Sequence, residues 1–217
     1  MSAEPRVEPT PSTRELHDGL GEEVLAVGAP PVPTATDARW GFHPCAAEGS
    51  DVDRDLDLVH GWMNSEHVAQ FWEQAWSREK WAGALAGQWA GTYSRPYIVS
   101  LDGEPFAYIE LYRAARDVIA RHYAARPHDV GYHVAIGDRG RTGRGLGGQL
   151  FLATIRGVFD AEPDCTRIMS DPEASHVGAR RMDERIGLTL LGEYELPHKR
   201  TALYVFPRSA ADLPSAR

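Results

Sequence analysis

The segment Gly131–Phe151 constrains the fold more strongly than any other part of the chain. Its sequence, GYHVAIGDRGRTGRGLGGQLF, runs from an alternating apolar stretch through a glycine-rich loop into an apolar helical pattern. Glycines let backbone N–H groups approach a ligand closely, and the start of a helix attracts negative charge. Arg141 and Arg144 can add charge-assisted hydrogen bonds. The segment therefore predicts a strand, an anion-binding loop and a helix, although such turns also occur as plain packing elements.

Seven β-rich runs and several helical patterns make up the rest of the folded part. The alternation of apolar residues predicts strands at residues 40–46, 97–101, 106–112, 130–136, 166–170, 189–195 and 201–206. Helical spacing and capping residues predict helices at residues 56–63, 68–72, 78–89, 147–159 and 175–186, with a short helix or turn at 114–123. The order does not repeat a βαβ unit, so a doubly wound dinucleotide fold is not expected. It predicts a mixed α/β protein with a mostly antiparallel central sheet flanked by helices.

Length and composition predict one domain with a tail at each end. Residues 1–37 are rich in Pro, Glu, Ser and Thr, which predicts a disordered or loosely ordered tail, with a short helix at 15–27 as the alternative. The folded domain is expected at 38–208, and residues 209–217 are expected to form a C-terminal tail.

Charge and cysteine content narrow the class of protein. A net charge of −8 argues against binding to nucleic acids and to anionic membranes. The chain has no apolar run of membrane-spanning length, no apolar signal core, and two cysteines that suggest no disulfide framework. We therefore expect a cytoplasmic protein, a monomer or homodimer, that binds a small molecule.

The order of elements, with the glycine loop after the fourth strand, resembles the GNAT acyltransferase fold. In that family the loop begins with Gln or Arg and continues through Gly to Gly or Ala; Gly145 and Gly147 match, and Thr142 stands at the first position. The resemblance implies an acyl-CoA co-substrate, such as acetyl-CoA or succinyl-CoA, and no metal. The residues implied to bind it are Val134, Ile136, Arg141, Gly143, Arg144, Gly145, Gly147 and Gly148.

A narrower resemblance covers residues 30–206. The chain is similar to the siderophore-biosynthesis N-acyltransferases, which acylate N-hydroxylated lysine, ornithine or cadaverine to hydroxamates. The motifs that carry it are Trp62-Met63-Asn64, Phe71-Trp72, Glu110-Leu111-Tyr112, Asp117, Tyr123, residues 129–133 (DVGYH) and residues 167–172 (RIMSDP). The resemblance implies that His133 and Asp171 are the catalytic pair. It implies that the acceptor, a small amine or hydroxylamine, meets Phe71, Trp72, Glu110 and Tyr112.

The residue types fit this chemistry. A neutral imidazole at His133 can accept the proton released by the acceptor nitrogen, and Asp171 can orient that imidazole or hold a cationic amine. Backbone N–H groups of residues 134–136 are expected to stabilise the oxyanion. Glu110, Asp117 and Asp129 are candidates for binding a distal ammonium group. The alternative is that His133 is a core histidine and Asp171 a turn residue before Pro172.

Two other functions remain open from the sequence. An aminoglycoside 6′-N-acetyltransferase shares the Trp62-Met63-Asn64 region and Asp171-Pro172, although residues 129–133 argue against it. A non-catalytic acyl-CoA-binding module is the second alternative, because Thr142 and Asp183 both depart from the family pattern. In many members a Tyr at the position of Asp183 protonates the leaving thiolate, so that role is not assigned here. A carboxylate-bearing acceptor would need a nearby cation, for which Arg113 and Arg116 are candidates.

Overall fold

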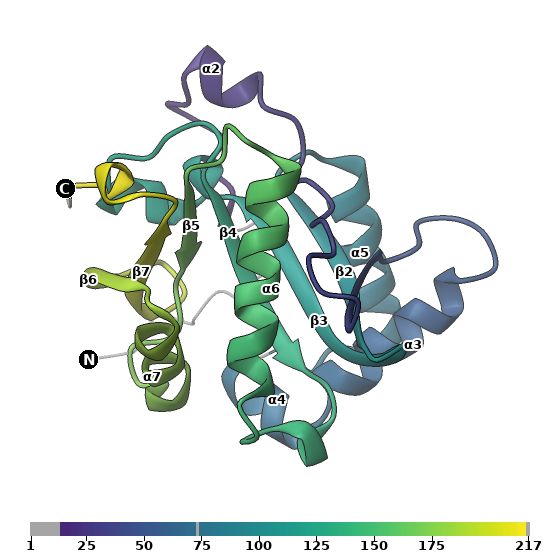
Figure 1. Cartoon of the computed structure of the whole chain (residues 1–217). Coiled ribbons are helices and arrows are strands. Elements are labelled where there is room, and N and C mark those ends of the chain that lie inside the picture. Colours follow the sequence, from purple (N-terminus) through teal and green to yellow (C-terminus); the bar gives the residue numbers. More distant parts are fainter. Residues whose placement is uncertain (1–13, 73, 216–217) are drawn as a thin grey trace, which may run out of the picture.

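A single seven-stranded sheet forms the centre of the protein, as Figure 1 shows for a computed structural model that describes residues 14–72 and 74–215. Its strand order is β1-β2-β3-β4-β5-β7-β6, and every neighbouring pair is antiparallel except β4 with β5. The strands are β1 (Trp40–Pro44), β2 (Ser94–Leu101), β3 (Glu104–Arg113), β4 (Val130–Ile136), β5 (Arg167–Ser170), β6 (Thr189–Glu195) and β7 (Arg200–Pro207). The predicted mixed, mostly antiparallel α/β architecture is therefore confirmed.

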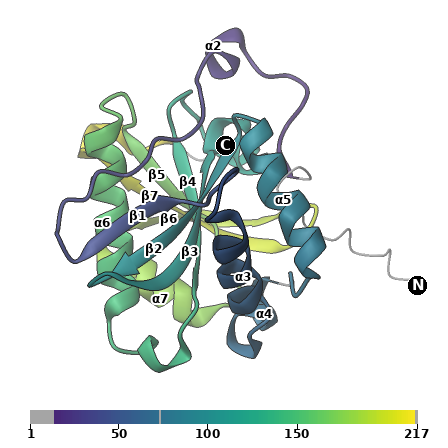
Figure 2. The ribbon, with the colours of Figure 1, turned by 90° about the vertical axis from the view of Figure 1, so that its right-hand side faces the viewer.

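Helices cover both faces of this sheet. They are α2 (Glu22–Leu25), α3 (Val52–Met63), α4 (Glu66–Trp72), α5 (Arg78–Ala90), α6 (Leu146–Ala161) and α7 (Val177–Ile186), with short 3-10 helices at Ala114–Arg116, Val118–His122, Arg139–Arg141 and Ala210–Asp212. Figure 2 shows α6 and α7 on one side of the sheet and α3, α4 and α5 on the other. The buried apolar residues divide accordingly, with α6 packed over the central strands and α3 and α5 packed against Ile98, Tyr108 and Ala135.

Local sequence signals explain where several elements begin and end. Asp102 and Gly103 have φ values of 54° and 84°, as a two-residue hairpin turn between β2 and β3 requires. Ser77 caps α5 by accepting a hydrogen bond from the Lys80 N–H at 3.2 Å. Gly187, at φ 101°, ends α7 in the left-handed conformation. These are the boundaries that a turn pair, a cap and a terminal glycine predict.

The parallel pair β4–β5 is the point at which the sheet opens. The two strands pair at Val130 with Ile168 and at Gly131 with Met169, whereas β4 pairs with β3 along its full length to Ile136. Beyond Gly131 the edge of β4 that faces β5 is therefore unpaired by a neighbouring strand. This divergence leaves backbone groups of β4 available to a ligand in the middle of the sheet.

The N-terminal residues 14–37 differ from the predicted loose tail. Arg14 and Val27 are buried, and the Thr34 N–H donates to the carbonyl of Gly157 on α6 at 3.0 Å. The predicted helix at 15–27 is reduced to α2. The composition is poor in apolar residues, but Pro33 packs against Gly157, where a Cβ would lie 2.9 Å from the proline side chain. Residues 1–13 of the predicted tail lie outside the described residues.

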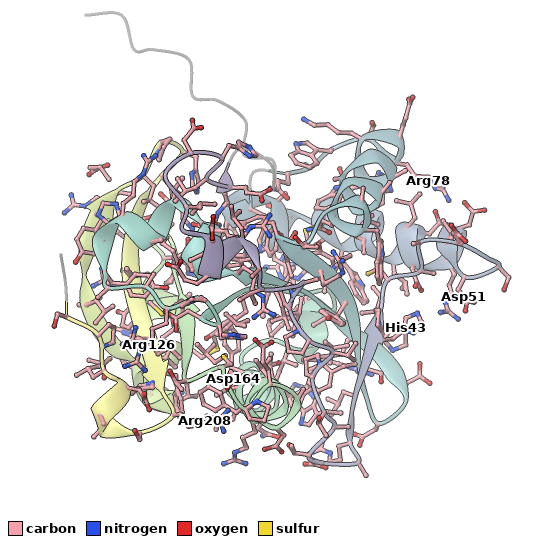
Figure 3. The ribbon with its side chains drawn as sticks, turned by 90° about the horizontal axis from the view of Figure 1, so that it is seen from above. His43, Asp51, Arg78, Arg126, Asp164 and Arg208 are labelled. Atoms are coloured by element: carbon pink, nitrogen blue, oxygen red, sulfur yellow. The ribbon has the colours of Figure 1, made fainter. Side chains whose placement is uncertain are left out.

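The C-terminal residues up to 215 also pack on the domain. Arg126 pairs with Asp212 at 2.7 Å, and Arg208 donates to the carbonyl of Cys165 at 2.8 Å. Figure 3 shows Arg126 and Arg208 on the side of the molecule that carries the C-terminal segment. The predicted tail at 209–217 is thus attached through residue 215. Among the described residues, no helix is long and apolar enough to cross a membrane.

Candidate active site

A cleft of about 790 Å³ lies beside the open edge of β4. The glycine loop before α6 lines one end of it, and His133, Asp171 and Glu110 line the other. Helix α4 and the start of α7 form its sides. The arrangement brings the sequence-predicted loop and the sequence-predicted acid–base residues into one cavity.

The glycine loop is open to a ligand. Gly143 and Gly145 have φ values of 73° and 76°, and a Cβ on either would meet no atom within 4 Å. Gly145 stands at the N-cap of α6 and offers no side chain to the first N–H groups of the helix. Those groups have no partner within the helix itself. The loop therefore presents unobstructed N–H donors and the positive end of α6, which suits a phosphate or pyrophosphate.

The arginines of the loop lie differently from the prediction. Arg139 lines the cleft together with Thr142, whereas neither Arg141 nor Arg144 is among its lining residues. Arg141 pairs with Asp138 at 3.4 Å and lies over the ring of Phe106, and Arg144 is exposed. The 3-10 turn at 139–141 directs Arg139 and Arg141 to different sides, which the sequence does not reveal. Arg139 is thus a candidate that sequence reasoning missed.

The open edge of β4 offers backbone donors. The Gly137 N–H bonds to the Phe106 carbonyl at 3.1 Å, so it points toward β3. Because successive residues of a strand alternate in direction, the N–H groups of Ile136 and Val134 point to the opposite, open edge. On that edge the carbonyls of Val134 and Ile136 accept hydrogen bonds from Trp72 Nε1 at 3.3 Å and His67 Nε2 at 2.9 Å. Helix α4 thus fixes the strand whose N–H groups face the cleft.

The His133 side chain projects from β4 and is surrounded by two aromatic rings and two carboxylates. Its ring stacks on Tyr112 with centroids 4.8 Å apart and meets the edge of Trp72 at 5.9 Å. Nε2 lies 3.2 Å from Asp171 Oδ1, and Nδ1 lies 3.7 Å from Glu110 Oε2. The side chain is 16% exposed. His133 is therefore held in one orientation but remains accessible from the cleft.

Both carboxylate oxygens of Asp171 have hydrogen-bond or ion-pair partners. Oδ1 accepts from the Tyr112 hydroxyl at 2.6 Å and lies beside His133, whereas Oδ2 pairs with Arg14 at 2.9 Å and Lys199 at 3.0 Å. Burial alone would raise the pKa of Asp171, but the charges of Arg14 and Lys199 outweigh burial and hold the pKa well below its usual range. Asp171 is therefore a permanent carboxylate, and its four partners leave little room for a substrate ammonium.

The end of the cleft near His133 contains three lining residues that sequence reasoning missed, Arg14, His198 and Lys199. Arg14 and Lys199 are paired with Asp171. Burial, together with the charges of Arg14 and Lys199, lowers the pKa of His198 to about 3, so that His198 is neutral. Single polar residues outside any motif carry no sequence signal for such a placement.

Most of the residues predicted to bind a charged group of the acceptor form ion pairs elsewhere in the protein and do not line the cleft. Asp117 is buried against Arg14 at 3.0 Å, and Asp129 pairs with Arg167 at 3.6 Å outside the cleft. Arg113 is paired with Glu162 at 2.8 Å, also away from the cleft. Arg116 pairs with Glu15. Glu110 lines the cleft, as Asp171 does, whereas the other candidates named in this paragraph do not.

The aromatic candidates lie on two sides of the cleft. Phe71, at the end of α4, is 42% exposed and stacks on His176 at the start of α7, with ring centroids 3.7 Å apart. Trp72 lies deeper, between Tyr108 and His133. Tyr112 is buried and reaches Asp171 rather than the cavity. Phe71 thus connects α4 with the start of α7 and Trp72 connects α4 with the sheet, whereas Tyr112 supports His133 and Asp171 from outside the cavity.

Asp183 is a buried carboxyl on the lining of the cleft. It accepts hydrogen bonds from Ser170 Oγ at 2.8 Å and from the Tyr132 hydroxyl at 3.4 Å. Burial raises the pKa of Asp183 to about 7. At neutral pH this carboxyl is therefore divided between its protonated and ionised forms.

Comparison with known proteins identifies relatives of the whole domain. The family model described as acetyltransferase (GNAT) domain matches residues 51–196. Lysine N-acyltransferase MbtK of Mycobacterium sp. (strain MCS) is 43% identical over 195 residues, which cover 90% of this chain and 78% of that protein. N(6)-hydroxylysine O-acetyltransferase of Escherichia coli is 31% identical over 163 residues, covering 73% of this chain and 50% of that protein.

A solved structure shares the fold. Aminoglycoside acetyltransferase AAC(6′)-Ib, in complex with coenzyme A, superposes with a TM-score of 0.67 at 23% identity, over 78% of this chain and 95% of that one. At this identity the likeness concerns the fold alone. It agrees with the sheet order and helical layers described above.

Proposed function

The chain belongs to the GNAT acetyltransferase family, and we propose that it transfers an acyl group from acyl-CoA to the nitrogen of an N-hydroxylated diamine or amino acid, forming a hydroxamate for a siderophore. The observation that carries the proposal is the cleft in which the glycine loop and His133 lie at opposite ends. Relatives named lysine N-acyltransferase and N(6)-hydroxylysine O-acetyltransferase support the choice of a lysine-like acceptor.

The donor would bind along the loop and the open edge of β4. The N–H groups of Gly143, Gly145, Gly147 and Gly148 would receive the pyrophosphate, and Arg139, which also lines the cleft, would add positive charge. The N–H groups of Val134 and Ile136 would pair with the extended pantetheine arm. The Val134 N–H, next to His133 along the strand, is the candidate donor to the oxyanion of the tetrahedral intermediate.

The acceptor would enter from the other end, between α4 and the 196–199 segment. Its nitrogen attacks the thioester carbon, a C–N bond forms, and the C–S bond breaks as the intermediate collapses. The nitrogen loses one proton in this sequence, and His133 is placed to accept it. Asp171 supports the imidazolium at 3.2 Å, and its four existing partners favour this orienting role over direct binding of an amine.

A second carboxylate beside His133 suggests how the acceptor is held. Glu110 is buried and lies on the Nδ1 side of His133, away from the cations that surround Asp171. An ammonium group at the far end of a diamine or amino acid would find its counter-charge there. Phe71 and Trp72 would cover the alkyl chain between the two ends.

The test is release of coenzyme A thiol with acetyl-CoA and succinyl-CoA as donors. The acceptor panel contains N6-hydroxylysine, N5-hydroxyornithine, N-hydroxycadaverine, lysine and cadaverine, and hydroxamate formation is read by the colour of its iron(III) complex. We expect turnover with N-hydroxy acceptors to exceed turnover with the plain amines. Equal rates for hydroxylamines and amines would refute the proposed preference for N-hydroxylated acceptors. An aminoglycoside is added to the panel, and its turnover in place of both other classes would favour an aminoglycoside 6′-N-acetyltransferase.

A further inference from the structure

The two ends of the cleft differ in charge. Arg139 lies in the turn after β4, and Arg185 adjoins Ile186, whose side chain would lie 3.2 Å from a Cβ at Gly148. Both arginines line the cleft, so positive charge lies at the end that contains the glycine loop. The end near His133 has the opposite balance, because its cations are matched by carboxylates and further carboxylates line it.

Among the described residues that line the cleft, the cations near His133 are Arg14 and Lys199, and both are already paired. Arg14 donates to Asp117 at 3.0 Å and to Asp171 at 2.9 Å. Lys199 Nζ donates to the backbone carbonyl of Asp171 and lies 3.0 Å from Asp171 Oδ2. Two carboxylates thus neutralise two cations at this end, and neither cation is left over for an anionic group of a substrate.

Glu110 is a buried carboxylate without a matching cation. The residue is 6% exposed and lines the cleft. Its carboxylate makes no hydrogen bond within residues 14–72 and 74–215, and its ion-pair contact there is with His133 Nδ1, 3.7 Å from Oε2. A buried carboxylate that lacks a hydrogen bond is energetically unfavourable. The position therefore favours a ligand that brings a positively charged donor group.

Glu173 adds a second unpaired carboxylate. It comes two residues after Asp171, lines the cleft and is partly buried. Its backbone carbonyl accepts a hydrogen bond from the His176 N–H at 2.8 Å, which fixes this part of the segment. The Glu173 side chain forms no ion pair with any residue in the described part of the chain. Glu110 and Glu173 together give the end near His133 an excess of negative charge.

We propose that the acceptor is an N-hydroxylated diamine rather than a free N-hydroxylated amino acid, and that Glu110 and Glu173 determine this preference. The inference rests on the acyl transfer proposed above and narrows its acceptor. A free amino acid brings an α-carboxylate, which would meet two unpaired carboxylates and, among the described residues, no unpaired cation at this end. A diamine brings an ammonium group alone. Arg113 and Arg116, the cations predicted for an acceptor carboxylate, form ion pairs elsewhere.

The experiment measures kcat/KM by thiol release with N-hydroxycadaverine, N6-hydroxylysine and N6-hydroxylysinamide. The amide keeps the length and the α-amino group of hydroxylysine but removes its negative charge. We expect N-hydroxycadaverine to exceed N6-hydroxylysine by about 10- to 100-fold, because like charges repel strongly in a partly buried site. The amide should recover most of this difference. Equal values for hydroxylysine and hydroxycadaverine would overturn the proposal, as would an amide as poor as the acid, since size would then explain the preference.

Charge variants of the full chain identify the residues responsible. Glu110→Gln and Glu173→Gln keep the shape of each side chain and should each reduce the preference. Glu104→Gln, at the exposed start of the strand that carries Glu110, is the matched control and should leave the preference unchanged. Glu173→Lys should raise kcat/KM for N6-hydroxylysine, because it supplies a cation. Thermal unfolding checks each variant, and the partly buried Glu173 provides the test if Glu110→Gln does not fold. A preference that persists in the folded Gln variants would overturn the assignment.

A binding measurement separates this inference from the proposed function. Titration calorimetry with cadaverine, lysinamide and lysine, each added to protein saturated with coenzyme A, reports the charge preference without turnover. We expect cadaverine and lysinamide to bind more tightly than lysine, and lysine binding as tightly as cadaverine would overturn the proposal. Failure of the wild type to acylate any acceptor would refute the proposed function, but the binding series would still test the roles of Glu110 and Glu173.

Discussion

Replacement of His133 by Ala tests the chemistry of the site most directly. The variant removes the proton acceptor but keeps the β4 N–H groups, the glycine loop and the Asp171 cluster. Transfer to an N-hydroxy acceptor, whose nitrogen is largely unprotonated, needs a base only as the intermediate collapses, so the loss should fall at the low end of base catalysis, about 100-fold in kcat. That corresponds to about 2.7 kcal/mol at about 1.36 kcal/mol per tenfold. With a plain amine, which must first lose a proton, the loss should approach about 10⁴-fold.

The assay is steady-state thiol release with the two acceptor types, together with thermal unfolding of each variant. The imidazole stacks on Tyr112 at 4.8 Å, so its loss should cost about 1 kcal/mol of stability. His133→Gln, which retains polar contacts without a base, serves as the control for packing. Near-full activity of His133→Ala would remove His133 from the mechanism. An equal loss with amine and hydroxylamine would show that His133 acts by shape rather than by proton transfer.

Three further variants test other parts of the structure. A Cβ at Gly131 would lie 2.1 Å from the Tyr112 ring. Gly131→Ala should therefore displace Tyr112, cost about 1–3 kcal/mol and lower kcat, whereas Gly61→Ala, which meets open space on α3, should not destabilise the protein in denaturant titrations. Burial raises the pKa of Asp183 from 3.8 to about 7, so the protonated carboxyl stabilises the folded state at low pH. This contribution to the free energy of unfolding, up to about 4 kcal/mol, is lost as the pH rises through that window. Asp183→Asn should flatten the pH dependence of stability, and an unchanged slope between pH 5 and 8 would contradict this expectation. Gly145→Ala places a side chain at a φ of 76°, which should cost about 1–2 kcal/mol of stability. The variant should raise KM for acyl-CoA and leave kcat at saturation little changed. An unchanged KM for acyl-CoA would argue against the loop as the pyrophosphate site.

The sequence predicts the frame of this molecule well because its signals are local. The alternating run at 130–136, the glycines after it and the apolar spacing of α6 each determine structure within a few residues. The Asp-Gly pair does the same for the β2–β3 hairpin. His133 and Asp171 were identified through motifs that surround them on consecutive elements, and they lie 3.2 Å apart. The structure thus brings the two residues together, and their catalytic role stays a prediction.

Arg14 shows where such reasoning ends. Its contacts with Asp117, His133 and Asp171 span 103, 119 and 157 positions of the chain. Its own segment has the composition of a tail, and the ion pairs of Arg14 join it to carboxylates that are far away in the sequence. The orientations of Arg139 and Arg141 are similarly decided by a single 3-10 turn. Long-range ion pairs and side-chain directions in short turns depend on the assembled fold.

The two carboxylates beside His133 lie on opposite sides of its ring and have different neighbours. Asp171 is shared by Arg14, Lys199, Tyr112 and His133, so moving any one of them changes the environment of the others. The cluster holds the His133 ring from the side of Nε2. Glu110 stands on the opposite side of the imidazole, 3.7 Å from Nδ1. Under the proposed function, the carboxylate that orients His133 is therefore separate from Glu110, the candidate for binding a cationic acceptor.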